Sequence, residues 1–471
     1  MSIQTLVTII LAVIELAYFS IMSRLLSKTD FGYYATITGI MAVLSSLSEA
    51  GLGASIIQKK GADNIYISVA YTLSAILGVC FTSFLYVSAP WIAKLIADET
   101  IIIPLKVISI TILLNGMNSC GNAILYKNLK FKIIGLNSII TCFISSIIGI
   151  ILAYLDFGLI SVITYSVLNS LITFVLLYMF YVKIPRFQIN KNDARKIFSF
   201  GGWLTLSALV NNIMNQVDKL LLPRWLSIEK LGAYNRPSGF LNTMSSKING
   251  IFDSVLFPML SDFQDDTKKI TAVFYRALEL LNTFSCILAL AFVFNSDLII
   301  NVFFGKDWRE LSTILQILSI SLVFNINNRL VDCFFRSLNY VKIGFYIRCL
   351  GLFLMLSAIY WGSRNGIVGV AIAVVTANII TILCKLLILC HKVHASKFKM
   401  LLTLICSWRA SLPLFLFGLP FMFFEHNLII EFIFAILFLI ILLIEFVFFP
   451  KFVGVEYRQT VYPYIKRIKN R

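Results

Sequence analysis

The chain has 471 residues, of which 59% are hydrophobic and only 13% are charged, and its mean hydropathy is +0.88. A soluble domain cannot hide so much apolar surface, and disorder requires low hydrophobicity, so both classes are excluded. The net charge of +17 is better explained by an anionic membrane surface than by a nucleic-acid partner. A helix needs about 20 apolar residues to cross a bilayer, so the length accommodates about fourteen spans and leaves little room for an extramembrane catalytic domain.

We therefore predict an all-α polytopic membrane protein with about fourteen transmembrane helices. The first helix begins at the initiator Met and lacks a cleavage site, so we expect it to be retained rather than removed as a signal peptide. In chain order, the predicted spans are 3–23, 36–56, 66–89, 101–121, 133–154, 159–181, 200–222, 237–258, 273–295, 311–333, 345–361, 367–389, 411–424 and 428–449.

Basic residues concentrate in alternate loops of this plan. With the N-terminus in the cytoplasm, the inner loops and the tail 450–471 hold roughly 25 Lys and Arg against roughly 9 in the outer loops, which predicts that both termini are cytoplasmic. We expect the tail to anchor at an anionic leaflet, with docking of a partner as the alternative. Its basic residues are Lys451, Arg458, Lys466, Arg467, Lys469 and Arg471.

Two segments that lie 200 residues apart resemble each other. Arg24–Tyr34 and Arg224–Tyr234 share Arg, Leu, Ser, Gly and Tyr at the same offsets, and the helix after each carries an acid, Glu49 or Asp253. We predict two six-helix lobes, 1–190 and 191–392, related by a parallel repeat with a cavity between them. Residues 393–471 then form two extra helices and the basic tail. The polar segment 183–196 is interpreted as a cytoplasmic linker that lets the lobes move.

Ionisable side chains inside spans are costly, so each one is a functional hypothesis. The first lobe has few of them: Glu15, Glu49 and Lys106. The seventh span is richer, because helical spacing puts one group on one face and a second group on the adjacent stripe. The face consists of Asn211, Asn215 and Asp218, and the stripe of Asn212, Gln216 and Lys219. Such a surface must meet another helix or water.

The tenth span carries a third polar face, made by Asn325, Arg329, Asp332 and Arg336. Arg329 and Asp332 are three residues apart, so pairing within the helix is the structural alternative to a functional role. Arg276 and Glu279 can neutralise each other in the same way. For Lys219 and Lys247, the alternatives to a water-filled cavity are snorkelling and pairing between helices.

If these side chains share a cavity, it suits an anionic, sugar-bearing substrate, because Arg and Lys bind phosphate and amides bind hydroxyl groups. The predicted substrate-binding residues are Lys219, Lys247, Arg276, Arg329, Asn212, Asn215 and Asn325. The carboxylates of Asp218, Glu49 and Asp332 are the candidates for binding a coupling Na⁺ or proton. We expect no catalytic residue, metal or cofactor, because Cys390, His391 and His394 lack a fourth ligand and phosphate-binding loops are absent.

Several segments, in this order, resemble bacterial polysaccharide flippases of the O-antigen and exopolysaccharide branch of the multidrug/oligosaccharidyl-lipid/polysaccharide exporter superfamily. In this resemblance Asp218 matches the acid of an Asn-x-x-Asp motif, and Glu49 the acid before Gly-Leu-Gly of the second helix. Pro223 departs from the family, which usually has Gly there. The segments are Arg24–Gly32, Gly51–Gln58, Asn215–Lys219, Leu231–Arg236, Leu256–Asp266 and Phe304–Trp308.

The resemblance implies two six-helix lobes in a V, two extra helices and alternating access. It implies translocation of undecaprenyl-diphosphate-linked oligosaccharide, the precursor of surface polysaccharide such as lipopolysaccharide O-antigen, to the outer leaflet of the bacterial inner membrane. A polysaccharide polymerase is then a possible partner.

Two other functions remain as alternatives. One is a membrane-embedded polysaccharide polymerase or ligase, which needs a large outer loop, whereas the longest here is about 15 residues, near 296–310. The other is a cation or drug antiporter of the same superfamily, for which the basic residues Lys219, Lys247 and Arg329 are a poor fit.

Overall fold

The computed structural model describes residues 3–49, 51–59, 63–96, 98–262, 267–338, 340–423 and 428–448. Within these ranges every regular element is a helix, which confirms the predicted all-α class. The chain divides into two compact units, residues 1–235 and 236–471. The six basic residues of the C-terminal tail lie outside the described residues, as does the side chain of Asp253.

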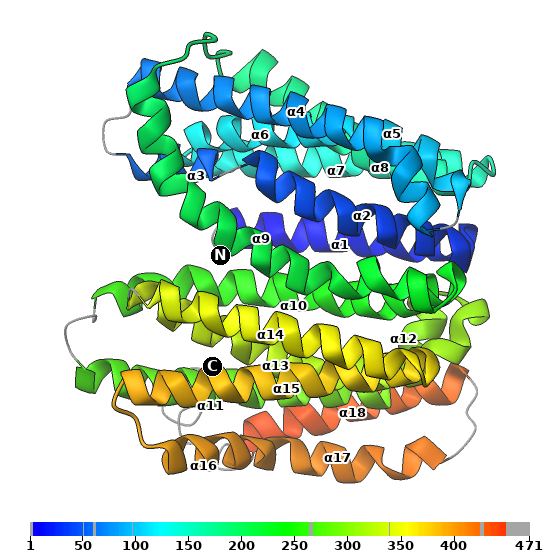
Figure 1. Ribbon diagram of the computed structural model, residues 1–471. Helices are drawn as coiled ribbons and strands as arrows, with labels where there is room; N and C mark the ends of the chain where they lie inside the picture. Colours follow the sequence, from blue (N-terminus) through cyan, green and yellow to red (C-terminus); the bar gives the residue numbers. More distant parts are fainter. Residues whose placement is uncertain are drawn as a thin grey trace. The chain divides into compact units, whose positions relative to one another are not determined.

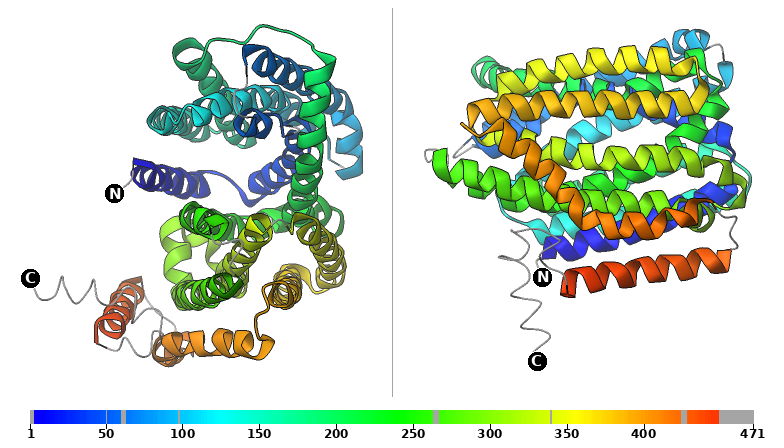
Figure 2. Two further views of the ribbon diagram at one scale, coloured as in Figure 1. Left: turned by 90° about the vertical axis from the view of Figure 1, so that its left-hand side faces the viewer. Right: turned by 90° about the horizontal axis from the view of Figure 1, so that it is seen from below.

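Long helices that lie side by side make up the first unit (Figure 1). The close neighbours are α2 with α9, α4 with α6, and α7 with both α1 and α8. Figure 2 (left) shows most of these helices nearly end-on, coloured from blue to green. The helices are α1 (Ile3–Leu25), α2 (Lys28–Glu49), α3 (Leu52–Gln58), α4 (Asn64–Ile96), α5 (Ile102–Ile108), α6 (Ile110–Lys127), α7 (Phe131–Tyr154), α8 (Leu159–Leu176), α9 (Lys191–Trp225) and the start of α10 (Ile228–Asp262).

Local sequence explains where two of these helices begin. Gly51 adopts a left-handed conformation with φ of 65°, which glycine tolerates best, and thereby separates α2 from α3. The Asn190 side chain accepts a hydrogen bond from the backbone N–H of Asn192 and caps the start of α9. Among the described residues of this unit, one apolar cluster forms around Tyr71 and Tyr178 and another around Ile37 and Leu105.

The repeat seen in the sequence has a structural counterpart where α2 crosses the start of α10. A Cβ atom built on Gly232 would lie 1.8 Å from the carbonyl oxygen of Lys28. A Cβ atom built on Gly32 would lie 2.0 Å from the carbonyl oxygen of Ile228. Gly32 and Gly232 occupy equivalent positions of the repeat, as do Lys28 and Ile228. Each glycine thus contacts the backbone of the other copy, and only glycine permits so close an approach.

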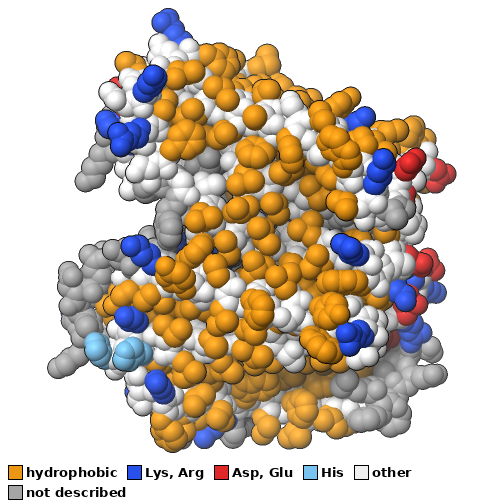
Figure 3. Space-filling view, viewed as in Figure 1, with side chains coloured by type: hydrophobic (Ala, Val, Ile, Leu, Met, Phe, Trp, Pro, Cys, Tyr) orange, Lys and Arg blue, Asp and Glu red, His pale blue; other side chains and the backbone are white. Residues whose placement is uncertain are grey.

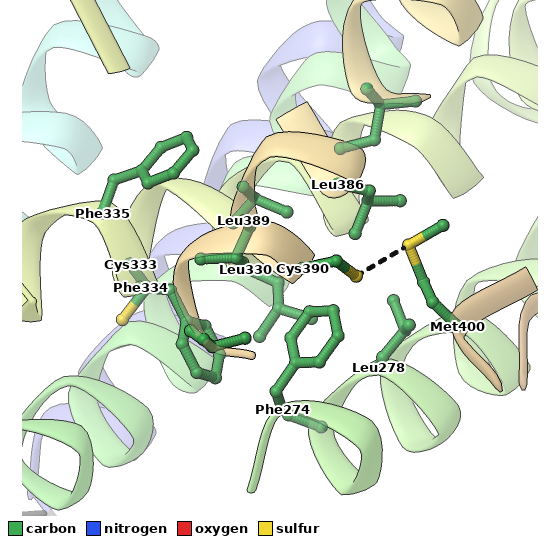
Figure 4. Packing of buried hydrophobic residues seen from close by; sticks show 14 of the residues in the cluster. Phe274, Leu278, Leu330, Cys333, Phe334, Phe335, Leu386, Leu389, Cys390 and Met400 are labelled. Atoms are coloured by element: carbon green, nitrogen blue, oxygen red, sulfur yellow. Dashed lines mark hydrogen bonds between the residues drawn. The ribbon is translucent and has the colours of Figure 1, made fainter. Parts of the chain in front are cut away.

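The second unit is built around α13, which packs against both α11 and α15, while α14 packs against α15. Figure 4 shows its main core, where Phe274, Leu330 and Phe334 share an apolar cluster with the leucines of α15. The Cys390 thiol lies 3.2 Å from the Met400 sulfur. The helices are α11 (Thr267–Phe294), α12 (Ser296–Phe303), α13 (Ser312–Ser337), α14 (Val341–Ser363), α15 (Gly366–Lys392), α16 (Lys397–Ser407), α17 (Leu412–Gly418) and α18 (Leu428–Phe448).

Eleven helical segments of the described chain are long and apolar enough to cross a membrane. The seventh and eighth predicted spans fall on α9 and α10, the least hydrophobic of the long helices, and the last on α18, which has a shorter apolar stretch. Hydrophobic side chains cover the middle of the helices on the face in Figure 3, and charged ones gather toward the helix ends. The count of fourteen spans stays a prediction, as do the lobe boundaries at 190 and 392.

Candidate functional site

A polar cavity of about 460 Å³ opens inside the first unit, between the end of α2, α3, α6 and α9. Glu49 is the only ionisable side chain among the described residues that line it. The other lining residues are small or carry hydroxyl and amide groups: Ala42, Ser45, Ser46, Gly51, Gly53, Ala54, Ser119, Thr205, Ala208 and Asn212.

A second cavity of about 360 Å³ adjoins the first, because Ala42 and Ser45 line both. Its described lining contains no charged side chain, and five of the ten residues carry a hydroxyl group. Two of its polar residues are held in place by each other, since the Ser170 hydroxyl lies 2.8 Å from Asn115 Oδ1. The remaining lining residues are Thr38, Met41, Ile108, Thr111, Ser166 and Gln216.

The polar stripe of α9, made by Asn212, Gln216 and Lys219, packs closely against α2 beside these cavities. A Cβ atom on Gly39 would lie 3.4 Å from Lys219 Cβ, and Asn212 Nδ2 lies 3.4 Å from the carbonyl oxygen of Ala42. Asn212 and Gln216 consequently line the first and the second cavity, respectively. The predicted stripe thus faces a helix and polar cavities, as its amphipathic spacing required.

The neighbouring polar face of α9, made by Asn211, Asn215 and Asp218, is partly exposed and partly buried. Asn215 is exposed, whereas Asp218 is buried with 6% of its surface accessible. The Asp218 carboxylate accepts a hydrogen bond of 2.8 Å from the backbone N–H of Lys219, and the side chain of Tyr234 also hydrogen-bonds to it. Tyr234 is the last residue of the repeated segment Arg224–Tyr234. A side chain of the repeat therefore helps to hold the carboxylate of Asp218, the acid of the Asn-x-x-Asp motif.

A second polar centre lies inside the second unit, where α15 packs on α13. Lys385 is fully buried, and its Nζ lies 2.6 Å from Asn328 Oδ1 and 2.9 Å from Asp332 Oδ1. Arg348 of α14 approaches the same carboxylate oxygen at 3.8 Å. Among the ion pairs of the described residues, Asp332 pairs with Lys385 and Arg348, and not with Arg329 of its own helix as the sequence allowed.

The other predicted binding residues of the second unit lie at its surface or close to it. Arg276 on α11 and Arg329 on α13 are exposed, whereas Lys247 on α10 and Asn325 on α13 are partly buried. Lys219, Asn212, Asn215, Asp218 and Glu49 belong to the first unit. The convergence of both groups on one cavity stays a prediction.

Sequence reasoning missed Lys385 and its neighbour Arg348. A signal was available, because Lys385 lies within the most hydrophobic candidate span, 366–392, seven residues before its end. A buried charge inside such a span requires a partner. The polar face of α13 offered one, but which helix packs on it cannot be read from the sequence.

Several known proteins resemble this chain in sequence and in fold. The model of the family described as polysaccharide biosynthesis protein matches residues 21–313. The chain belongs to this family. It is 24% identical over 416 residues to the lipopolysaccharide biosynthesis protein WzxC of Escherichia coli (strain K12), covering 86% of this chain and 83% of the relative. It is also 26% identical over 316 residues to the teichuronic acid biosynthesis protein TuaB of Bacillus subtilis (strain 168), covering 66% of this chain and 65% of that protein.

Solved structures agree on the fold of this family member. The lipid II flippase MurJ in an inward closed conformation superposes with a TM-score of 0.75 at 16% identity, covering 98% of this chain and 100% of that one. An inward-facing multidrug resistance transporter of the MATE family gives 0.62 at 15% identity, covering 84% of this chain and 95% of that one. Together with the relatives, these matches confirm the predicted resemblance to polysaccharide flippases of the exporter superfamily, and the chain is a multi-pass membrane protein.

Proposed function

We propose that this chain is a flippase that translocates undecaprenyl-diphosphate-linked oligosaccharide repeat units from the cytoplasmic to the outer leaflet for surface polysaccharide synthesis. The observation that carries the proposal is the pair of cavities in the first unit. Their volumes lie within the ordinary range of ligand sites, and their linings are rich in hydroxyl and amide groups. Such a lining exchanges hydrogen bonds with sugar hydroxyls, which a drug-binding cavity would not require.

The substrate would be divided between two kinds of side chain. Asn212, with Asn215 and Asn325, would bind sugar hydroxyls, and Glu49 would accept hydrogen bonds from them as a carboxylate. The diphosphate would meet the basic residues, because Lys and Arg are the usual phosphate-binding side chains. These are Lys219, Lys247, Arg276 and Arg329. The polyprenyl tail would stay in the lipid.

Transport would proceed by alternating access of two lobes that rock about the linker 183–196. An ion gradient of Na⁺ or H⁺ would drive it through the carboxylates of Asp218 and Glu49. Asp218 is the better placed of the two to respond to movement, because its partner Tyr234 lies on the next helix, beside the reciprocal glycine contact. Both termini would be cytoplasmic, and a polysaccharide polymerase would receive the product at the outer leaflet.

A deletion strain tests this proposal against the polymerase or ligase alternative. Loss of the flippase should leave complete, unpolymerised repeat units on the inner leaflet and remove polymer from the surface. Radiolabelled lipid-linked oligosaccharide, probed with an impermeant reagent in spheroplasts, reports the leaflet. Repeat units that reach the outer leaflet and stay unpolymerised there would overturn the flippase proposal.

Glu49→Gln is expected to reduce surface polymer about tenfold, because a hydrogen bond to a charged carboxylate contributes about 1.5–3 kcal/mol and one to the neutral amide oxygen only about 0.5–1.5 kcal/mol. Glu99→Gln is the matched control, since Glu99 is exposed at the start of a short 3-10 helix away from the cavity lining. Complementation of the deletion strain at equal protein abundance measures the effect. Equal polymer from both variants would remove Glu49 from the site.

A further inference from the structure

In the second unit, the sequence predicts that the Asp332 carboxylate binds a coupling ion. In the structure this carboxylate is already paired with the ammonium group of Lys385. Lys385 Nζ lies 2.9 Å from Asp332 Oδ1 and 2.6 Å from Asn328 Oδ1, on consecutive turns of α13. Carboxylate and amide oxygens are also the ligands that would coordinate a dissolved monovalent cation inside a membrane protein. The lysine therefore occupies the position that such an ion would need.

The surroundings explain why this cation is held tightly. The side chain of Lys385 is 0% exposed, and its neighbours Ile382, Leu386 and Leu389 belong to the apolar core of the second unit. Arg348 adds a second positive charge 3.8 Å from Asp332. A further dissolved cation would join two positive charges that already face this one carboxylate, which is electrostatically unfavourable in a medium of low dielectric constant.

We propose that Lys385 is a built-in cation that fills the Asp332–Asn328 site, so that this carboxylate is structural and binds no coupling ion while the lysine is present. Removing the ammonium without filling its space converts the pair into a binding site for a small external cation. This inference rests on the proposed function only where transport is the readout. Its geometry is independent of the substrate.

The test compares two variants of the full-length protein in detergent. Lys385→Ala removes three methylene groups and the ammonium, which together correspond to propylammonium, whereas Lys385→Met removes the charge but fills most of the space. Thermal unfolding is measured with propylammonium chloride, with sodium chloride and with choline chloride at equal ionic strength. We expect propylammonium to raise the Tm of Lys385→Ala by several degrees and to leave the Tm of Lys385→Met and the wild type unchanged.

Two results would overturn the inference. One is a Lys385→Ala protein that no cation stabilises, and the other is a wild-type protein whose Tm rises with sodium unless Asp332 is replaced. If Lys385→Ala folds too poorly to purify, its yield is compared in cells grown with and without propylamine. Propylamine should raise the yield of Lys385→Ala and leave that of Lys385→Met unchanged. Equal yields of Lys385→Ala with and without propylamine would contradict the proposal.

Transport distinguishes this inference from the proposed function. In the deletion strain, wild-type protein should restore polymer, Lys385→Ala should restore less, and propylamine in the medium should raise the polymer level of Lys385→Ala alone. If wild-type protein does not restore transport while the Tm shift persists, the proposed function fails and the built-in cation stands. If wild-type protein restores transport but propylamine has no effect on Lys385→Ala, the inference fails.

Discussion

Asp332→Asn is expected to destabilise the second unit by about 3–5 kcal/mol, the usual cost of removing one partner of a buried ion pair. The cost is high because this single carboxylate compensates two cations, Lys385 at 2.9 Å and Arg348 at 3.8 Å. Lys385→Met should cost less, since Asp332 would keep Arg348 as a partner. Chemical unfolding of the purified protein, followed by its tryptophan fluorescence, measures the difference.

Asp307→Asn is the control for this prediction. Asp307 is exposed in the short helix before α13, so the same change of charge occurs without loss of a buried partner. Its effect should stay within about 0.5 kcal/mol. The ion-pair account of α13 would be wrong if Asp332→Asn and Asp307→Asn unfolded at the same denaturant concentration.

Gly232→Ala is expected to have the second large effect, because the new methyl group would lie 1.8 Å from the carbonyl oxygen of Lys28. The obstacle is backbone, so α2 and α10 must separate, and overpacking of this kind costs about 1–3 kcal/mol or more. Gly32→Ala should behave alike, since its methyl group would meet the Ile228 carbonyl oxygen at 2.0 Å. Both variants should lower the Tm and impair complementation.

Two other glycines provide the comparison. A Cβ atom on Gly202 in α9 or on Gly239 in α10 would meet nothing within 4 Å. Alanine at these positions should be neutral or stabilising by up to about 1 kcal/mol, because alanine favours the helix. If Gly239→Ala and Gly232→Ala lowered the Tm equally, the helix crossing would not depend on the close contact.

Much of the fold could be predicted from sequence, because a membrane imposes long apolar helices and their hydropathy is visible. The repeat was visible too, since Gly32 and Gly232 share an offset within segments 200 residues apart. Their reciprocal contact could not be foreseen from spacing alone. It depends on how α10 crosses α2, which is a tertiary property.

The sequence predicts which polar side chains of the candidate site share one face of a helix. It does not predict which helices pack against that face. Helical periodicity placed Asn212, Gln216 and Lys219 on one stripe, and the structure sets that stripe against α2 and the polar cavities. For Asp332, the sequence offered only Arg329, three residues away on the same helix. The observed partner, Lys385, comes from 53 residues further along the chain, and only the packing of α15 on α13 reveals it.

Reconstitution tests the central claim most directly. Purified protein is placed in liposomes that contain labelled undecaprenyl-diphosphate oligosaccharide and carry a Na⁺ or H⁺ gradient. It should make the sugar on both leaflets accessible to an impermeant oxidant, whereas protein-free liposomes should expose only the outer half. Glu49→Gln protein should slow the approach to full accessibility. If wild-type protein leaves half of the label protected, with correct insertion shown by protease digestion, the account of this chain as a flippase is contradicted.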